Sequence, residues 1–166
     1  MAFASSSSSI VLSKCEFDVF VSFRGADTRH DFTSHLVKYL RGKGIDVFSD
    51  AKLRGGEYIS LLFDRIEQSK MSIVVFSEDY ANSWWCLEEV GKIMQRRKEF
   101  NHGVLPIFYK VSKSDVSNQT GSFEAVFQSP TKIFNGDEQK IEELKVALKT
   151  ASNIRGFVYP ENRYLK

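Results

Sequence analysis

The feature that most constrains this chain is a regular alternation of short apolar runs with longer segments of helical periodicity. The apolar runs are rich in β-branched and aromatic residues and end at glycine or polar residues, which is typical of buried strands. They lie at residues 17–23, 45–48, 71–76, 103–109 and 156–159. Between them, apolar residues recur every three or four positions, as on one face of a helix. These helical segments lie at residues 27–41, 58–69, 86–100 and 137–153.

Near-continuous apolar strands separated by helices predict a parallel sheet that is covered on both faces. Right-handed crossovers leave few topologies, and five such strands suit the flavodoxin-like order of a three-layer α/β domain. Pro106 removes one ladder hydrogen bond from the fourth run, which predicts a place near a sheet edge or a bulge. Residues 111–122 are expected to form a polar loop, and residues 122–128 a short helix.

Composition argues against several classes of function. The net charge of +2 is too small to indicate a nucleic-acid or membrane partner, and no apolar run approaches the length of a membrane span. Cys15 and Cys86 form neither a disulfide framework nor a metal site, so no metal is expected and a reducing compartment fits best. Residues 1–15 begin with a serine-rich stretch that we interpret as a disordered leader, with a transit peptide as the alternative.

The sequence SWWCLEEV at residues 83–90 follows the third apolar run after the short polar segment at residues 77–82. In an open α/β sheet this position is the carboxyl end of a strand, where ligands bind. Adjacent helical residues point about 100° apart, so only one of Glu88 and Glu89 can face a cleft. The alternative is that Trp84 and Trp85 anchor the core while both carboxylates lie on a solvated helix face.

A second candidate site joins the first strand to the first helix, where residues 23–29 read FRGADTR. A glycine followed by Asp or Thr as helix cap opens backbone N–H groups toward an anion, and Arg24 and Arg29 add phosphate-pairing donors. From spacing alone, a well-capped surface turn is favoured instead. The sequence has neither a GxGxxG fingerprint nor a P-loop, so it supports neither a Rossmann dinucleotide site nor a nucleotide triphosphatase.

Taken together and in order, several segments resemble plant Toll/interleukin-1 receptor (TIR) domains. The resemblance covers residues 16–160 and leaves residues 161–166 as a short tail. Several ordered motifs are far more specific than any one of them alone. The matching segments are FDVFVSFRG at 17–25 with DTR at 27–29, SHL at 34–36, SIVVFS at 72–77, YA at 80–81, Ser83 with WCL at 85–87 and Glu89, VLPIFY at 104–109, and QTG at 119–121 with Phe123.

The resemblance implies a flavodoxin-like domain of plant innate immune signalling, located in the cytoplasm and also the nucleus. It further implies a self-association-dependent hydrolase that cleaves the nicotinamide–ribose bond, an NAD⁺ nucleosidase of the ADP-ribosyl cyclase type. NAD⁺ or NADP⁺ is then the substrate, and no tightly bound cofactor is expected. The implied partners are further copies and other TIR-domain immune receptors, not nucleic acid or membrane. The alternative is a catalytically weak interaction module that recruits or regulates other TIR receptors.

The resemblance also implies roles for particular residues. Glu89 matches the catalytic glutamate, four residues after the tryptophan of W-C-L-x-E, and would stabilise the oxocarbenium character that develops on the ribose as nicotinamide leaves. Ser34 and His35 match a self-association pair. The implied substrate contacts lie in the loops after the first two strands and beside the cleft: Arg24, Gly25, Ala26, Asp27, Thr28, Arg29, Gly56 and Trp85.

The chain departs from the family pattern in three places. Gly55 occupies a position that is usually arginine, and Lys113 occupies the usual proline position of V-D-P-S-D-V. Family domains also carry one more helix after the fifth strand, so we expect this helix to be lacking in a chain that stops at Lys166. The altered loop at Gly55 and the missing helix favour the interaction module, whereas the intact Glu89 motif favours the enzyme.

Overall fold

The computed structural model describes residues 15–25, 32–49, 59–129 and 134–159. Within these residues, five parallel strands form one sheet in the order β2-β1-β3-β4-β5. This is the flavodoxin-like order, so the predicted fold class is confirmed. Most of the expected leader, the tail and the chain after Tyr159 lie outside the described residues. The strands are β1 (Phe17–Phe23), β2 (Val47–Ser49), β3 (Ser69–Phe76), β4 (Gly103–Tyr109) and β5 (Phe157–Tyr159).

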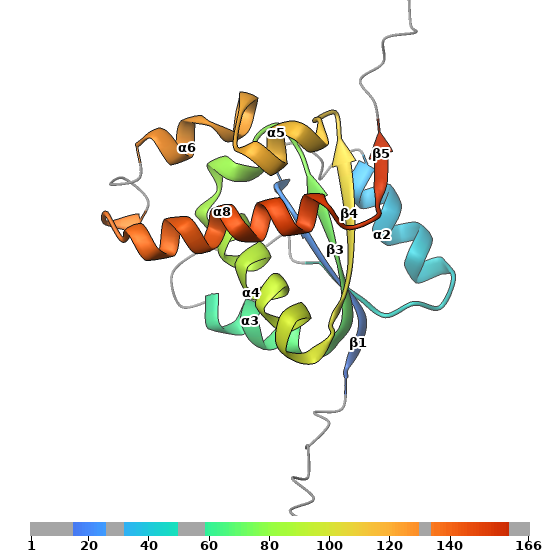
Figure 1. The fold of residues 1–166 in the computed structure, drawn as a ribbon. Coiled ribbons are helices and arrows are strands. Elements are labelled where there is room, and N and C mark those ends of the chain that lie inside the picture. The colour runs from blue at the N-terminus through green and yellow to red at the C-terminus, as the bar shows by residue number, and fades with distance from the viewer. Residues whose placement is uncertain (1–14, 26–31, 50–58, 130–133, 160–166) are drawn as a thin grey trace, which may run out of the picture.

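Helices cover both faces of the sheet (Figure 1). α2 (Phe32–Gly42) packs on one face of the sheet. There Val37 contacts a buried cluster formed by every second residue of the strands, such as Val19 and Val21 of β1. α3 (Ile59–Glu67), α4 (Trp84–Phe100) and α8 (Glu138–Ser152) pack on the opposite face around a larger cluster. Strands that are apolar on both sides require this three-layer arrangement. Shorter elements complete the described chain: η2 (Tyr80–Asn82), α5 (Lys113–Asn118), η3 (Gly121–Phe123) and α6 (Ala125–Gln128).

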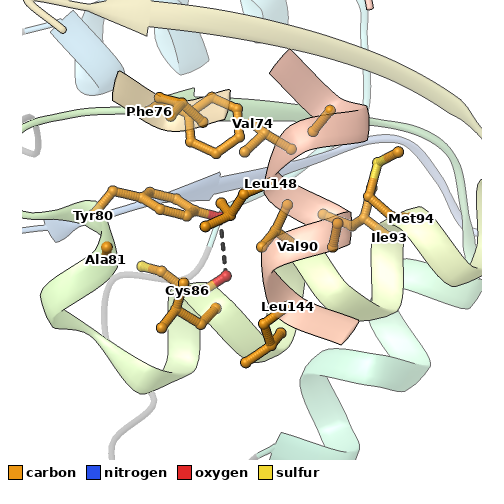
Figure 2. Packing of buried hydrophobic residues seen from close by; sticks show 14 of the residues in the cluster. Val74, Phe76, Tyr80, Ala81, Cys86, Val90, Ile93, Met94, Leu144 and Leu148 are labelled. Atoms are coloured by element: carbon orange, nitrogen blue, oxygen red, sulfur yellow. Dashed lines mark hydrogen bonds between the residues drawn. The ribbon is translucent and has the colours of Figure 1, made fainter. Parts of the chain in front are cut away.

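The larger cluster fixes the position of α4 between the sheet and α8. Leu144 and Leu148 of α8 are almost fully buried and lie beside Val90 of α4 (Figure 2). Gly91 permits this close approach, because a Cβ at that position would lie 3.0 Å from Leu144 Cδ2. Since interiors are close-packed, α4 has little freedom to rotate. The direction of each of its side chains, the two adjacent carboxylates included, is therefore set by core packing.

The border between α3 and β3 falls earlier than predicted. The helix expected at residues 58–69 ends at Glu67, and Ser69 already pairs with Phe17 of β1. The Ser69 hydroxyl donates to the Arg65 carbonyl at 2.7 Å, which satisfies an acceptor in the last turn of α3. Sheet pairing and this side-chain bond decide the border, and neither is visible in hydrophobic periodicity.

The loop predicted at residues 111–122 is wrong, because α5 forms there. Ser112 is the N-cap, and its Oγ accepts a hydrogen bond from the Asp115 N–H at 3.1 Å. Val116 is the one fully buried side chain of α5, so the segment lacks the periodic pattern by which longer helices are recognised. The short helix expected at residues 122–128 is present in two parts, η3 and α6.

Gly156 lies against β4 just before β4 and β5 pair. β4 is one strand in from the edge, and its pairing with β5 begins at Ile107↔Phe157, directly after Pro106. A Cβ at position 156 would clash with the Pro106 carbonyl oxygen. We expect Gly156→Ala to displace β5 and to lower the free energy of unfolding by about 1–3 kcal/mol. Urea denaturation measures this loss.

The matched control for this prediction is Gly42→Ala at the end of α2. A Cβ at Gly42 meets nothing within 4 Å. Its free energy of unfolding should therefore stay within about 0.5 kcal/mol of the wild-type value. An equal loss in both variants would contradict the proposed clash with Pro106.

We expect His102 to make the fold sensitive to acid. The side chain is buried, and its Nε2 lies 2.8 Å from Ser72 Oγ. Burial first, and nearby Arg96 second, lower the pKa of His102 from 6.5 to about 4. Between these two pH values the unfolded chain binds more protons than the folded one, so stability falls as the pH falls. We expect a loss that approaches about 3 kcal/mol at pH 4.

Urea denaturation at pH 7 and pH 4.5 tests the role of His102. His102→Gln cannot be protonated, so its stability should depend less on pH than that of the wild type over this range. His35 is exposed on α2, and His35→Gln should keep the full dependence. If both variants keep the wild-type dependence, the acid sensitivity comes from other groups.

A candidate active site at the carboxyl end of the sheet

Glu89 lies in the first turns of α4, directly above the sheet. Ser83 is the N-cap of α4, and its Oγ accepts a hydrogen bond from the Cys86 N–H at 3.4 Å. Only 9% of Glu89 is exposed, which is unusual for a carboxylate. Its Oε2 accepts a hydrogen bond from the hydroxyl of Ser22 near the end of β1. The helix therefore places a buried carboxylate at the carboxyl edge of the central strands.

A buried hydroxyl pair adjoins this carboxylate. Ser22 Oγ lies 2.8 Å from the phenol oxygen of Tyr80, and both residues are fully buried. The Tyr80 hydroxyl also donates to the Cys86 carbonyl at 3.0 Å, the dashed contact in Figure 2. Burial is the main cause that raises the pKa of Tyr80 well above 10, followed by the neighbouring Cys86 and Glu89. Three elements, β1, η2 and α4, thus meet in one polar network.

Glu88 points elsewhere. Its Oε2 accepts from the Lys140 ammonium of α8 at 2.9 Å. The two adjacent carboxylates of α4 therefore diverge, one toward the sheet and one toward α8, as the helical spacing predicts. The alternative in which both lie on a solvated helix face is wrong.

The two tryptophans stack on each other at the start of α4, with ring centroids 4.2 Å apart. Trp84 is 39% exposed and is not a core anchor, whereas Trp85 is partly buried and packs against the larger cluster. The core-anchor interpretation therefore holds only for Trp85.

The other predicted substrate contacts are only partly described. Arg24 and Gly25 follow β1 directly and are half-buried. They lie close to the first turn of α4, because the Cys86 thiol is 3.5 Å from the Phe23 carbonyl oxygen. The remaining contacts lie outside the described residues: Ala26, Asp27, Thr28, Arg29 and Gly56.

The predicted self-association pair does not belong to this site. Ser34 and His35 are exposed on α2, which covers the opposite face of the sheet from α4 (Figure 1).

Sequence reasoning missed Ser22 and Tyr80 as residues of this site. A serine within the apolar run of β1 is a signal for a buried polar group, but the sequence does not reveal its partner.

A groove of about 780 Å³ opens on the other side of α4, between α4 and α8. Glu88 and Lys140 line it, and Glu89 does not.

Among the described residues, no group of three or more His, Cys, Asp or Glu side chains is placed to hold a metal ion. In the same part of the chain, no helix has both the length and the apolar character that a membrane span requires.

Comparison with known proteins assigns the family. The TIR domain profile matches residues 16–162. The chain is 53% identical over 150 residues to disease resistance-like protein DSC1 of Arabidopsis thaliana, which covers 90% of this chain and 12% of that protein. It is 47% identical over 155 residues to TMV resistance protein N of Nicotiana glutinosa, covering 92% and 13%. The chain thus spans about an eighth of the length of these relatives.

A solved structure agrees with this assignment. The TIR domains in the structure of the activated Roq1 resistosome, which recognises the pathogen effector XopQ, superpose with a TM-score of 0.78 and 41% identity. The match covers 89% of this chain and 90% of that one. This chain belongs to the TIR domain family.

Proposed function

We propose that this TIR domain is an NAD(P)⁺ glycohydrolase of plant defence signalling, with Glu89 as the catalytic carboxylate. The observation that carries the proposal is the buried Glu89 side chain at the carboxyl edge of the sheet, bonded to Ser22. Its neighbour Glu88 is already paired with Lys140. The relatives are disease resistance proteins of plants, which supports a role in defence.

The proposed reaction requires one well-placed carboxylate and few other protein groups. Nicotinamide departs as a neutral base, so no general acid is required, unlike in most glycoside hydrolysis. Positive charge develops on the ribose ring as the bond breaks. A carboxylate fixed in a site of low dielectric stabilises that charge more strongly than one in water. Glu89 would also accept hydrogen bonds from the ribose hydroxyls and so hold the ring in place.

The remaining proposed contacts bind the nucleotide rather than react with it. Arg24 would pair with a phosphate, together with the loop at residues 25–29 and Gly56. Trp85 would contribute an aromatic wall beside the ring. NAD⁺ or NADP⁺ is the substrate in this scheme, and no tightly bound cofactor takes part.

Activity in this proposal depends on self-association through Ser34 and His35, with further copies or with other TIR receptors, in the cytoplasm and nucleus. The exposure of this pair also favours a second candidate function, an interaction module with little catalysis. The two candidates differ in one measurable product.

The test is to incubate the purified chain with NAD⁺, and separately with NADP⁺, and to measure free nicotinamide by chromatography. The expected result is nicotinamide release whose specific activity, per molecule of protein, rises with protein concentration. The release should be missing from a Glu89→Ala preparation of equal stability. No release at any concentration, with the chain also fused to an oligomeric scaffold, would overturn the glycohydrolase and leave the interaction module.

A further inference from the structure

The buried network beside Glu89 contains two residues to which the proposed reaction gives no role. We infer that Ser22 and Tyr80 are positioning residues, with Ser22 holding the Glu89 carboxylate and Tyr80 holding Ser22. This inference rests on the proposed function, and it adds the part of the site that orients the catalytic group. Both hydroxyls come from outside α4, from β1 and η2.

The number of available protons sets the direction in which the hydrogen bonds of the network are donated. Three contacts join four groups in a row: Glu89 to Ser22, Ser22 to Tyr80, and Tyr80 to the Cys86 carbonyl. When Glu89 is ionised, only the two hydroxyls carry protons. The Ser22 proton goes to Glu89, so a hydrogen bond between Ser22 and Tyr80 requires the Tyr80 proton, which is then shared between Ser22 Oγ and the Cys86 oxygen in a three-centre bond. Tyr80 is then the only group in the row that can donate to Ser22.

Tyr80 is well suited to this task because it has a fixed place and stays protonated. Its ring packs edge-on against Phe76 with centroids 5.1 Å apart, and none of the side chain is exposed. The η2 turn is closed by hydrogen bonds from Tyr80 N–H to the Ser77 carbonyl at 3.1 Å and from Ser83 N–H to the Tyr80 carbonyl at 3.2 Å. Because burial raises the pKa of Tyr80 well above 10, the phenol remains a donor at neutral pH.

The consequence is a carboxylate that is oriented before substrate arrives. Preorganised groups contribute to catalysis because they need no reorganisation in the transition state. Loss of the orienting bonds should therefore lower kcat and leave KM almost unchanged. A merely structural role for the two hydroxyls would instead lower stability and leave the kinetics of the folded fraction unaltered.

The experiment is a double-mutant cycle with Ser22→Ala, Tyr80→Phe and the double variant. The rate of nicotinamide release is normalised to folded protein. Losing a hydrogen bond to a charged group should lower kcat roughly 30-fold in Ser22→Ala, and the indirect effect of Tyr80→Phe should be about 5-fold. KM for NAD⁺ should stay within about twofold in both. Because Tyr80 acts through Ser22, the double variant should be no slower than Ser22→Ala alone.

Ser72→Ala is the matched control. Ser72 is also fully buried on the same face of the sheet, but its hydroxyl bonds to His102. Its variant should lose stability and keep the wild-type kcat. A kcat loss in Ser72→Ala equal to that in Ser22→Ala, or multiplicative losses in the double variant, would overturn the positioning role.

A second measurement separates this inference from the proposed reaction. The carboxyl ¹³C resonance of Glu89, assigned by its disappearance in Glu89→Gln, should move in Ser22→Ala and in Tyr80→Phe, and stay in place in Ser72→Ala. If the wild type releases no nicotinamide but the resonance moves, the glycohydrolase fails and the network stands. An unmoved resonance in both variants overturns the network whatever the activity.

Discussion

Replacing Glu89 by alanine should lower kcat for nicotinamide release by at least about a hundredfold, whereas Glu88→Ala should keep most of the activity. The reason is the divergence of the two side chains. Glu89 is buried beside Ser22 at the edge of the sheet, and Glu88 is paired with Lys140 of α8. In the proposed reaction, only Glu89 would reach a ribose held above the central strands. Steady-state kinetics on the two variants, at equal folded concentration, checks the prediction.

Glu89→Gln sharpens this test because the amide keeps the size of the side chain and an oxygen that can accept from Ser22. It should be about as inactive as Glu89→Ala if the negative charge is the essential property. Glu88→Ala serves as the matched control, since it removes a neighbouring carboxylate and costs roughly 1 kcal/mol of stability through the lost ion pair. An inactive Glu88→Ala beside an active Glu89→Ala would show that the roles of the two glutamates are reversed.

Forced clustering should raise the specific activity of the dilute chain by about a hundredfold. Ser34 and His35 lie exposed on α2, and the side chains of β5 at the sheet edge are also exposed. A small interface must offset several kcal/mol of lost rigid-body freedom, so free copies should associate weakly. Tethering raises the effective concentration to the millimolar range without any new contact. Nicotinamide release is measured over a dilution series, free and fused to an oligomeric scaffold.

The control for clustering is a pair of charge changes on the same helix. His35→Glu should weaken both the rise with concentration and the gain from the scaffold. Lys38→Glu, at another exposed position of α2, should weaken neither. Equal specific activity at every dilution would instead describe a self-sufficient monomeric enzyme.

Much of the fold follows from local sequence patterns. β1 and β4 have the predicted bounds, since apolar runs with β-branched and aromatic residues end at glycine or polar residues. The predicted helix at residues 137–153 spans α8 together with its caps, because Asp137 accepts from the Lys140 N–H at 3.1 Å and its apolar residues recur at helical spacing. α5 was missed because one buried valine makes no pattern.

The candidate site was also predicted in part from the sequence and decided in part by the tertiary structure. The sequence by itself determined that a carboxylate pair follows the third strand, at the ligand-binding edge of a parallel sheet, and that its two members must diverge. Only the tertiary structure decided which partner each one has. Ser22 and Glu89 are 67 positions apart in the sequence, and Ser22 and Tyr80 are 58 apart. Such contacts depend on strand pairing and on the position of α4 between α8 and the sheet. Hydrophobic periodicity indicates only the face of an element on which each residue lies.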